Sequence, residues 1–244
     1  MSSQARKARD KARLRNQVLD AARDLFVQHG YEAVTMRRIA AKVEYTATAL
    51  YFHFQNKTAL LQALSDREGL ALGVEFGKLR SLKDPIERVR RMGETYIQFG
   101  LAEPNRYRLL FMTPQPALPP EQSAIPKGDP KVDAYALLVQ TLAEAIAAGL
   151  LQPKYSDAEQ VAQLLWSAMH GFVSLNLVLH NDPWIDWRPV APTGRLLIDT
   201  LVAGLTRLTG PADPISISSR KGAGTHLRRT TTTKEQTNKQ RTMP

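Results

Sequence analysis

The stretch TMRRIAAKVEYTATALYFHFQNK, residues 35–57, decides the fold because it contains three residues that are suited to begin helices. Thr35, Thr46 and Asn56 each carry a side-chain oxygen that can accept a hydrogen bond from the unpaired N–H groups at the start of a helix. The segments between them suit one short helix each. Two short helices joined by a tight turn form a helix-turn-helix, in which the second helix enters the major groove of DNA. The sequence therefore predicts a DNA-reading unit over residues 35–54.

The aromatic part of this stretch has a second interpretation, because large side chains follow one another from Leu50 to Phe54 as in a buried strand. A strand would have to stay extended between Thr46 and Asn56, two good helix caps, and the residues after Thr46 are compatible with a helix. We therefore prefer the helix. Leu50 and Phe54, four residues apart, then share an inward face, and Tyr51 lies on another side.

The rest of the chain also has the apolar spacing of helices. Helix starts or ends are indicated at Gly30, Asp84-Pro85, Glu103-Pro104, Asp129-Pro130 and Ser156-Asp157. Residues 113–130 carry six prolines and are expected to form a loop. Apart from the aromatic stretch, no segment shows the alternation of a strand. The predicted class is all-α, with about nine helices.

Composition excludes several kinds of site and indicates a soluble protein. The chain has no cysteine, so disulfides, a thiolate nucleophile and a thiolate zinc site are excluded. No apolar run approaches the ~18 residues of a membrane span. The N-terminus has no hydrophobic run after its charges and therefore does not look like a secretory signal. We expect a cytoplasmic protein without a membrane partner.

The net charge of +10 is concentrated at the two ends of the chain. Residues 1–66 hold 11 Lys/Arg against 6 Asp/Glu, and residues 211–244 hold 7 against 2. A basic N-terminal part beside a neutral body favours a polyanionic partner, although a basic tail without any partner would look the same. We interpret residues 1–11 as a basic arm and residues 211–244 as a disordered tail.

Residues 18–64 resemble the N-terminal domain of TetR-family transcriptional regulators. The resemblance rests on Ala21-Ala22, Leu25-Phe26, Gly30-Tyr31, Thr35, Ile39-Ala40, Leu50-Tyr51, Phe54, Lys57 and Leu60-Leu61. It implies a DNA-binding domain over residues 12–72 and a helical domain over residues 73–210 that binds an effector and forms a homodimer. The chain departs from the family at the turn, where a small residue and glycine are usual and Val43 and Glu44 stand here. Its Tyr45, Thr46 and Thr48 replace the usual apolar residue, serine and glycine.

Nine residues are candidates for contact with a double-stranded DNA operator. They are Thr35, Arg37, Thr46, Ala47, Thr48, Ala49, Tyr51, His53 and Lys57. The short side chains of residues 47–49 allow close approach to base edges, and the resemblance places Arg37 near base edges, where it can bind guanine. The resemblance implies phosphate contacts for the two caps at 35 and 46 and for the residues at 51, 53 and 57. Taken singly, each residue also has an ordinary role as a cap, a packing group or a solvated side chain.

The resemblance further implies a twofold dimer through the last two long helices, about residues 157–180 and 193–209. The segment LWSAMHGFVSL, residues 165–175, is similar to the Trp–His–Gly signature of one C-terminal domain class in the family. Candidates for lining an effector cavity are Tyr96, Phe99, Tyr107, Phe111, Met112, Trp166, Met169, His170 and Phe172. Aromatic residues at helical spacing are more often plain core, and a lone histidine is more often structural. The small-molecule effector itself is not identified, and no cofactor or metal is expected.

Two other classes of protein remain as alternatives to a ligand-responsive repressor. A helical enzyme is disfavoured because the five histidines lack the spacing of a helical zinc site and no phosphate-binding loop or nucleophile elbow is present. A non-specific architectural DNA-binding protein would use both basic ends and would bind DNA with little sequence preference and a steep salt dependence.

Overall fold

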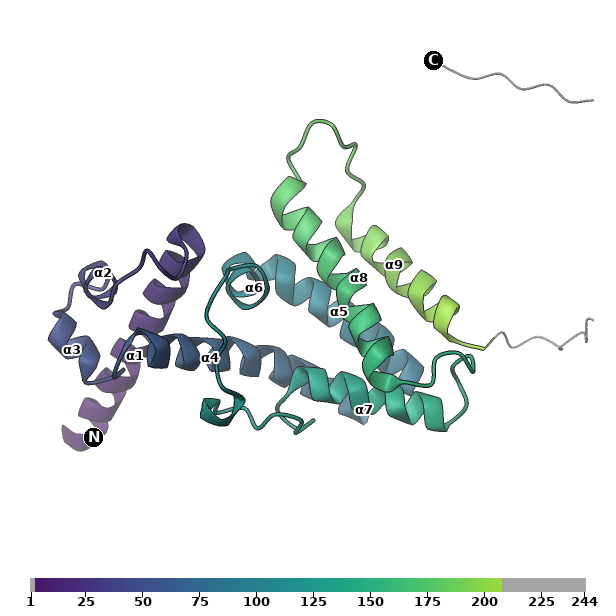
Figure 1. Cartoon of the computed structure of the whole chain (residues 1–244), viewed down its shortest axis with the longest axis horizontal. Helices are drawn as coiled ribbons and strands as arrows, with labels where there is room; N and C mark the ends of the chain where they lie inside the picture. Colours follow the sequence, from purple (N-terminus) through teal and green to yellow (C-terminus); the bar gives the residue numbers. More distant parts are fainter. Residues whose placement is uncertain (1–2, 208–244) are drawn as a thin grey trace, which may run out of the picture. The chain divides into compact units, whose positions relative to one another are not determined.

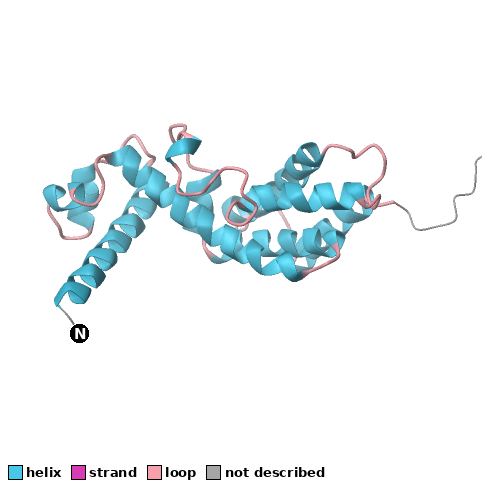
Figure 2. Cartoon of the chain, turned by 90° about the horizontal axis from the view of Figure 1, so that it is seen from below, coloured by secondary structure: helices cyan, strands magenta, loops and turns pink. Residues whose placement is uncertain are grey.

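The computed structural model describes residues 3–207, and the predicted tail at 211–244 lies outside the described residues. Within this range the fold is all-α, as predicted, with nine α-helices, two short 3-10 helices and a single isolated bridge between Leu151 and Thr206 (Figure 2). The α-helices are α1 (Ser3–His29), α2 (Met36–Lys42), α3 (Ala47–Tyr51), α4 (Lys57–Gly77), α5 (Pro85–Ala102), α6 (Pro104–Phe111), α7 (Ala134–Ala147), α8 (Ala158–Leu179) and α9 (Val190–Leu205). The 3-10 helices are η1 (Lys78–Ser81) and η2 (Pro120–Gln122).

All three predicted helix caps in the stretch 35–57 are confirmed. The Thr35 hydroxyl accepts a hydrogen bond from the backbone N–H of Arg38 at 3.2 Å, and Thr46 accepts one from Ala49 at 3.2 Å. The Asn56 amide oxygen accepts one from the N–H of Ala59 at 2.8 Å. These bonds satisfy donors that the first turn of a helix leaves unpaired, so the sequence defines where α2, α3 and α4 begin.

Helices α1 to α3 and the first half of α4 enclose one hydrophobic core (Figure 1). Phe26, Ile39, Leu50 and Leu61 are fully buried in it, and Phe54 is buried beside them. The aromatic stretch is therefore a short helix followed by a turn, with Leu50 and Phe54 inward as predicted. The core holds α3 at the surface, which leaves one side of this helix free for contact with another molecule.

Three predicted boundaries differ from the structure. Residues 3–11, predicted as an arm, are the first turns of α1, because this segment has no proline or glycine and is rich in alanine, lysine and arginine. Helix α4 continues to Gly77, past the predicted domain boundary at 72. The last helix covers Val190–Leu205 rather than 193–209. Directly after it, Thr206 forms an isolated antiparallel bridge with Leu151.

The second half of α4 packs with α5, α7, α8 and α9 around a second core (Figure 1). Helix α6 contributes to both cores, because Leu109 is buried in the first and Tyr107 in the second. Helix α8 is long and apolar enough to cross a membrane by length and composition alone. The same composition suits a helix that packs on three others, and α8 contacts α5, α7 and α9.

Candidate functional site

The structure brings the predicted DNA contacts together at α2, α3 and the start of α4. Thr35, Arg37, Thr46, Thr48 and Tyr51 are exposed, and Ala47, Ala49, His53 and Lys57 are partly buried. The side chain of Tyr51 is 52% exposed although it is aromatic. We call these nine residues the reading surface. Its centre is formed by the small residues of α3, Ala47, Thr48 and Ala49.

The two threonine caps keep a free hydrogen-bond donor. The oxygens of Thr35 and Thr46 accept from backbone N–H groups, so each hydroxyl proton remains available to an acceptor outside the helix. Phosphate oxygens are acceptors, and a hydroxyl that is already fixed by a cap loses little conformational freedom on binding one. Capping and phosphate contact are therefore compatible functions of the same side chain.

Lys57 is tied to the end of α1 rather than free in solvent. Its ammonium group donates a hydrogen bond to the carbonyl oxygen of Tyr31 at 2.9 Å and lies 4.0 Å from the centre of the Tyr31 ring. The Tyr31 hydroxyl in turn lies 3.2 Å from the hydroxyl of Thr58. The lysine charge is thus held at the N-terminus of α4, where helix N–H groups also favour an anion.

His53 lies beside positive charge that comes from α1. Partial burial, followed by the nearby charges of Lys11 and Arg15, lowers the pKa of His53 from its ordinary 6.5. The Arg15 guanidinium sits 5.0 Å from the centre of the Phe54 ring. The basic residues of the first helix therefore extend the positive field to the C-terminal end of α3. The sequence did not predict that Lys11 and Arg15 would lie beside His53 and Phe54.

Two exposed aromatic residues of the same surface were missing from the prediction. Tyr45 is 44% exposed in the turn before α3, and Phe52 is 82% exposed directly after it. The apolar face of Phe52 has no cover in the described part of the chain. The signal was present in the sequence, because on a helix Phe52 cannot share the inward face of Leu50 and Phe54.

The turn between α2 and α3 contains the one described non-glycine residue with a positive φ angle. Glu44 has φ 60° and donates its N–H to the carbonyl oxygen of Ala41 at 3.2 Å. A side chain in this left-handed conformation is strained, and glycine would adopt it without a steric cost. The turn keeps its conformation and places a carboxylate beside the reading surface.

Replacing Glu44 with glycine is expected to stabilise the protein and to strengthen DNA binding. Release of the left-handed strain is worth about 1 kcal/mol, less a part lost to the flexibility of glycine in the unfolded chain. Thermal unfolding measures the first effect and titration with duplex DNA the second. Glu44→Gln is the control, since it removes the charge but keeps the strain. If the Gln variant gains as much stability as the Gly variant, backbone strain at Glu44 is not the cause of the gain.

A cavity of about 230 Å³ lies inside the second core. Of the nine predicted pocket residues, Tyr96, Phe111, Trp166 and Met169 line it. The other five do not line it. Phe99, Met112 and Phe172 pack in or against the core, and the rings of Tyr107 and His170 stack on each other outside the lining. The lining also contains residues that were not predicted, among them Leu72, Phe76, Met92, Tyr135, Ile198 and Val202. The cavity is therefore built from α4, α5, α6, α7, α8 and α9.

A chain of hydrogen bonds runs from the cavity wall into the protein. The indole N–H of Trp166 donates to the Tyr96 hydroxyl at 2.9 Å. The hydroxyls of Tyr96 and Tyr107 are 3.0 Å apart, and the Tyr107 hydroxyl lies 2.7 Å from Nδ1 of His170. Burial raises the pKa of both tyrosines, most strongly that of Tyr107. Both hydroxyls therefore stay protonated. We call these four residues the polar chain.

The loop between α6 and α7 closes one side of the cavity and is fastened to α4. The carboxylate of Asp66 accepts a hydrogen bond from the Ser123 hydroxyl at 2.6 Å. Ile125 and Val132 of the loop line the cavity. At Gly73 of α4, a Cβ atom would lie 2.2 Å from the carbonyl oxygen of Val132, so only glycine allows this close approach. The loop and the helix that begins at the reading surface are thus in direct contact.

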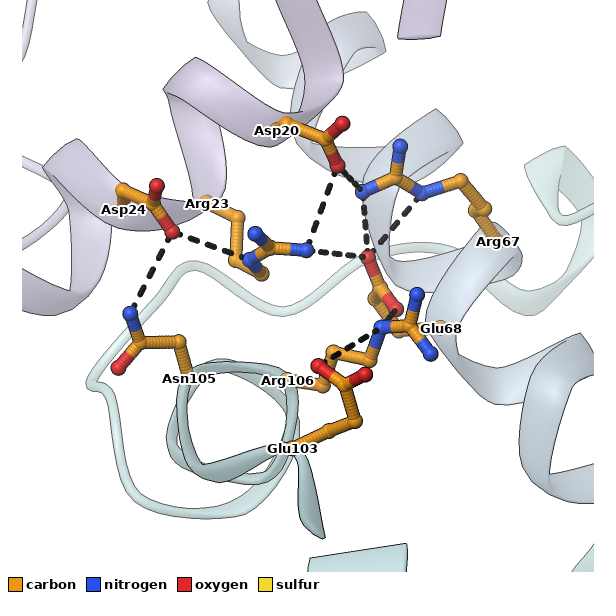
Figure 3. A network of polar contacts seen from close by, with 8 residues as sticks. All are labelled: Asp20, Arg23, Asp24, Arg67, Glu68, Glu103, Asn105 and Arg106. Carbon is orange, nitrogen blue, oxygen red and sulfur yellow. Dashed lines mark hydrogen bonds and ion pairs between the residues drawn. The ribbon is translucent and has the colours of Figure 1, made fainter. Parts of the chain in front are cut away.

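A cluster of charged residues joins α1, α4 and α6 (Figure 3). At its centre is Glu68 of α4, whose side chain is 1% exposed. Its carboxylate lies 2.5 Å from Arg67 and 2.9 Å from Arg106 of α6, and Arg23 of α1 approaches to 3.8 Å. Arg67 also pairs with Asp20 of α1 at 2.9 Å. One buried carboxylate therefore holds arginines from three helices, which we call the Glu68 cluster.

Helix α6 links this cluster to the cavity. Arg106 pairs with Glu68, and the neighbouring Tyr107 belongs to the polar chain. Asn105 bonds the Asp24 carboxylate of α1 at 3.4 Å, and Phe111 lines the cavity. A shift of α6 in response to a cavity ligand would therefore reach α1, which packs against α2, and α4, whose first residue belongs to the reading surface.

Two family models match consecutive parts of the chain. "Bacterial regulatory proteins, tetR family" matches residues 18–64, and "Tetracyclin repressor-like, C-terminal domain" matches residues 89–203. The first range contains the reading surface from Thr35 to Lys57. The second contains α6 to α8 entirely and most of α5 and α9. The two matches thus correspond to the two cores of the fold.

Individual relatives agree with the family models. The chain is 35% identical over 99 residues to the HTH-type transcriptional activator FasR of Mycolicibacterium smegmatis, which is 40% of this chain and 45% of FasR. It is 43% identical over 51 residues to a tetracycline repressor protein of class A from Escherichia coli, 21% of this chain and 24% of that protein. The chain thus matches less than half the length of these curated relatives.

The fold is also that of a solved regulator. A TetR family transcription regulator from Marinobacter aquaeolei superposes with a TM-score of 0.66 at 19% identity, covering 82% of this chain and 98% of the other. At this identity the likeness concerns the fold alone. With both family models and the fold in agreement, the chain belongs to the tetR family of bacterial regulatory proteins.

Proposed function

We propose that the protein is a ligand-responsive transcriptional repressor that binds a palindromic operator as a homodimer and is released by a small-molecule effector. The observation that carries the proposal is the pairing of an exposed reading surface with an internal cavity, connected through α4 and α6. The tetracycline repressor among its relatives supports repression. A DNA-binding function supports a cytoplasmic location, and no part of the proposal requires an enzymatic reaction.

In the proposed complex α3 lies in the major groove. The small side chains of Ala47, Thr48 and Ala49 contact base edges, and Arg37 binds guanine from α2. Thr35, Thr46, Tyr51, His53 and Lys57 contact phosphates. The exposure of the Tyr51 side chain and the fixed position of Lys57 support this assignment. Tyr45 and Phe52 extend the contact beyond the predicted set.

The dimer is proposed to form through α8 and α9. Large apolar side chains are exposed on one side of this pair, at Leu164, Leu175, Val178 and Leu196. On α8 the first three fall on one helix face, where Leu175 and Val178 are neighbours and Leu164 lies about three turns away. A Cβ atom at Gly171 or Gly204 would meet nothing within 4 Å, so both helices have open surface there. A second copy related by a twofold axis would cover this face and set the distance between the two reading surfaces.

Release from DNA is proposed to follow from differential affinity of the effector for two arrangements of the helices. The cavity is lined by residues of α4 and α6, and the same two helices meet α1 in the Glu68 cluster. An arrangement that better fits a bound ligand would move α4 and change the separation of the two reading surfaces. Ligand and operator would then oppose each other's binding.

Operator affinity is expected to rise as the pH falls through 6.5 and below. In the free protein the pKa of His53 is lowered by burial and by Lys11 and Arg15. Phosphate oxygens of a bound operator would favour the charged imidazole and raise this pKa, so the complex takes up a proton that the free protein does not hold. Titration across about pH 5.5–8 measures the slope. His53→Gln should flatten it, and an unchanged slope in this variant would remove His53 from the phosphate contacts.

The proposal is tested by selecting bound sequences from random duplex DNA. A repressor of this kind enriches one palindrome whose half-sites lie about one helical turn, roughly 34–36 Å, apart. A non-specific architectural binder enriches no palindrome and shows a steep salt dependence on all duplexes. Enrichment of a single unpaired half-site would contradict the dimer while keeping the reading surface.

A further inference from the structure

The cavity offers almost no polar group to a ligand. Besides the apolar side chains, its lining includes only Asp133, Tyr96, Tyr135 and Trp166 with oxygen or nitrogen in the side chain. Asp133 accepts the N–H groups of Tyr135 and Ala136 as the cap of α7, at 2.9 and 3.1 Å, and that of Gly128 at 3.1 Å. The Tyr135 hydroxyl donates to Glu159 at 2.6 Å. No charged group in the lining is left without a partner, so a charged ligand would lose its hydration without compensation.

The polar chain has one preferred direction when the cavity is empty. The indole N–H of Trp166 can only donate, so the Tyr96 oxygen accepts from it. The acceptor for the Tyr96 hydroxyl proton in the described residues is the Tyr107 oxygen, and the Tyr107 proton then goes to Nδ1 of His170. In the opposite direction the Tyr96 proton would have no acceptor. A buried donor without a partner is costly, so the first direction prevails.

From this arrangement we infer that the cavity binds an uncharged, mainly hydrocarbon ligand with a single hydrogen-bond acceptor, such as a ketone or ester oxygen. The acceptor takes the proton of the Tyr96 hydroxyl, and the chain reverses. Tyr107 then donates to Tyr96, and His170 donates to Tyr107 from Nδ1, which its other tautomer allows. Every member of the chain keeps a partner in both directions. The inference rests on the proposed function, because it specifies the effector of the same cavity.

If the hydrogen bonds of the polar chain reverse on binding, part of the ligand affinity depends on the ligand oxygen as well as on the size of the ligand. Acetophenone and ethylbenzene are suitable probes, because they differ only in a carbonyl group in place of a CH₂ group. Their affinities for the full chain are measured by calorimetric titration. In Tyr96→Phe, acetophenone is expected to lose about fivefold, the value of one hydrogen bond, while ethylbenzene keeps its affinity. Tyr155→Phe is the matched control, because Tyr155 packs against the same core but does not line the cavity, and both probes should bind it as they bind the wild type.

Tyr107→Phe gives a prediction of opposite sign. Without the Tyr107 oxygen, the Tyr96 proton has no acceptor in the free protein, and a ligand carbonyl supplies one. Acetophenone should therefore bind this variant more tightly than the wild type, by about fivefold, with ethylbenzene unchanged. A residue that merely packs in the wall would not produce a gain for one probe alone.

The outcomes separate the inference from the proposed function. If both probes bind but every variant changes their two affinities by the same factor, Tyr96 does not donate a hydrogen bond to the ligand oxygen. The cavity would then remain the proposed effector site. If neither probe binds the wild type, the inferred ligand class is wrong, while the proposed function is decided separately by the selection of a palindrome from random DNA. Tight binding of benzyltrimethylammonium would contradict the exclusion of charged ligands.

Discussion

Replacing Glu68 with glutamine is expected to destabilise the protein by about 3 kcal/mol. The buried carboxylate is the shared partner of Arg23, Arg67 and Arg106. Removing its charge leaves three neighbouring arginines with only the more exposed carboxylates Asp20, Asp24 and Glu103 as partners, and removal of one partner from a buried ion pair costs several kcal/mol. The expected value lies at the low end of that range because the arginines are themselves partly exposed to water. For a domain of this size the melting temperature should fall by about 6–12 °C.

Glu103→Gln is the matched control for this prediction. Glu103 also pairs with Arg106, at 3.9 Å, but its side chain is 53% exposed. An exposed pair contributes about 0–1 kcal/mol, so the control should melt close to the wild type. Equal melting temperatures for the two variants would show that the ion pairs of the Glu68 cluster do not contribute substantially to the packing of α1, α4 and α6.

Replacing Arg37 with alanine is expected to weaken operator binding by about 2 kcal/mol per half-site, roughly 30-fold, and to relax the preference at one base position. Arg37 is exposed on α2 and its guanidinium forms no ion pair within residues 3–207, so it is free to bind guanine. The neighbouring Arg38, by contrast, bonds the ring of His29 at 2.8 Å. Affinity for the selected operator and for its single-base variants measures both effects.

Arg188→Ala is the control for the loss of one positive charge. Arg188 lies in the loop between α8 and α9, pairs with Asp186 and is 73% exposed. Its removal should change operator affinity by less than about twofold, because it acts only through the screened field of the whole protein. If Arg37→Ala weakens operator and random DNA by the same factor, Arg37 contacts a phosphate and not a base.

The helices that carry the reading surface were largely predictable because the determinants of their starts and inward faces are local. A cap and the first turn of its helix lie within three residues of each other, so Thr35, Thr46 and Asn56 could be identified without knowledge of the fold. The inward faces of Leu50 and Phe54 follow from helical periodicity in the same way. Whether residues 3–11 are helical depends instead on how far α1 extends toward the N-terminus. No cap residue marks that point in the sequence, because α1 continues through the segment without interruption.

The cavity could be predicted only in part because it is formed by contacts between distant segments. Apolar residues such as Ile198 and Val202 of α9 have the same pattern whether they fill a core or face a void. Gly69 and Gly73 are a recoverable signal, because glycines four residues apart in a helix indicate close approach of another chain segment. The Glu68 cluster had no such signal, since nothing in the sequence distinguishes Glu68 from an exposed glutamate.

The central claim is that α3 and its neighbours read one specific sequence, and a direct comparison of two duplexes tests it. The protein is titrated at physiological salt with the palindrome obtained by selection and with a shuffled duplex of equal length and composition. A specific regulator predicts tighter binding of the palindrome by at least about 10³-fold. A ratio near one, with affinity that falls steeply with salt on both duplexes, would contradict the account and identify a non-specific DNA-binding protein.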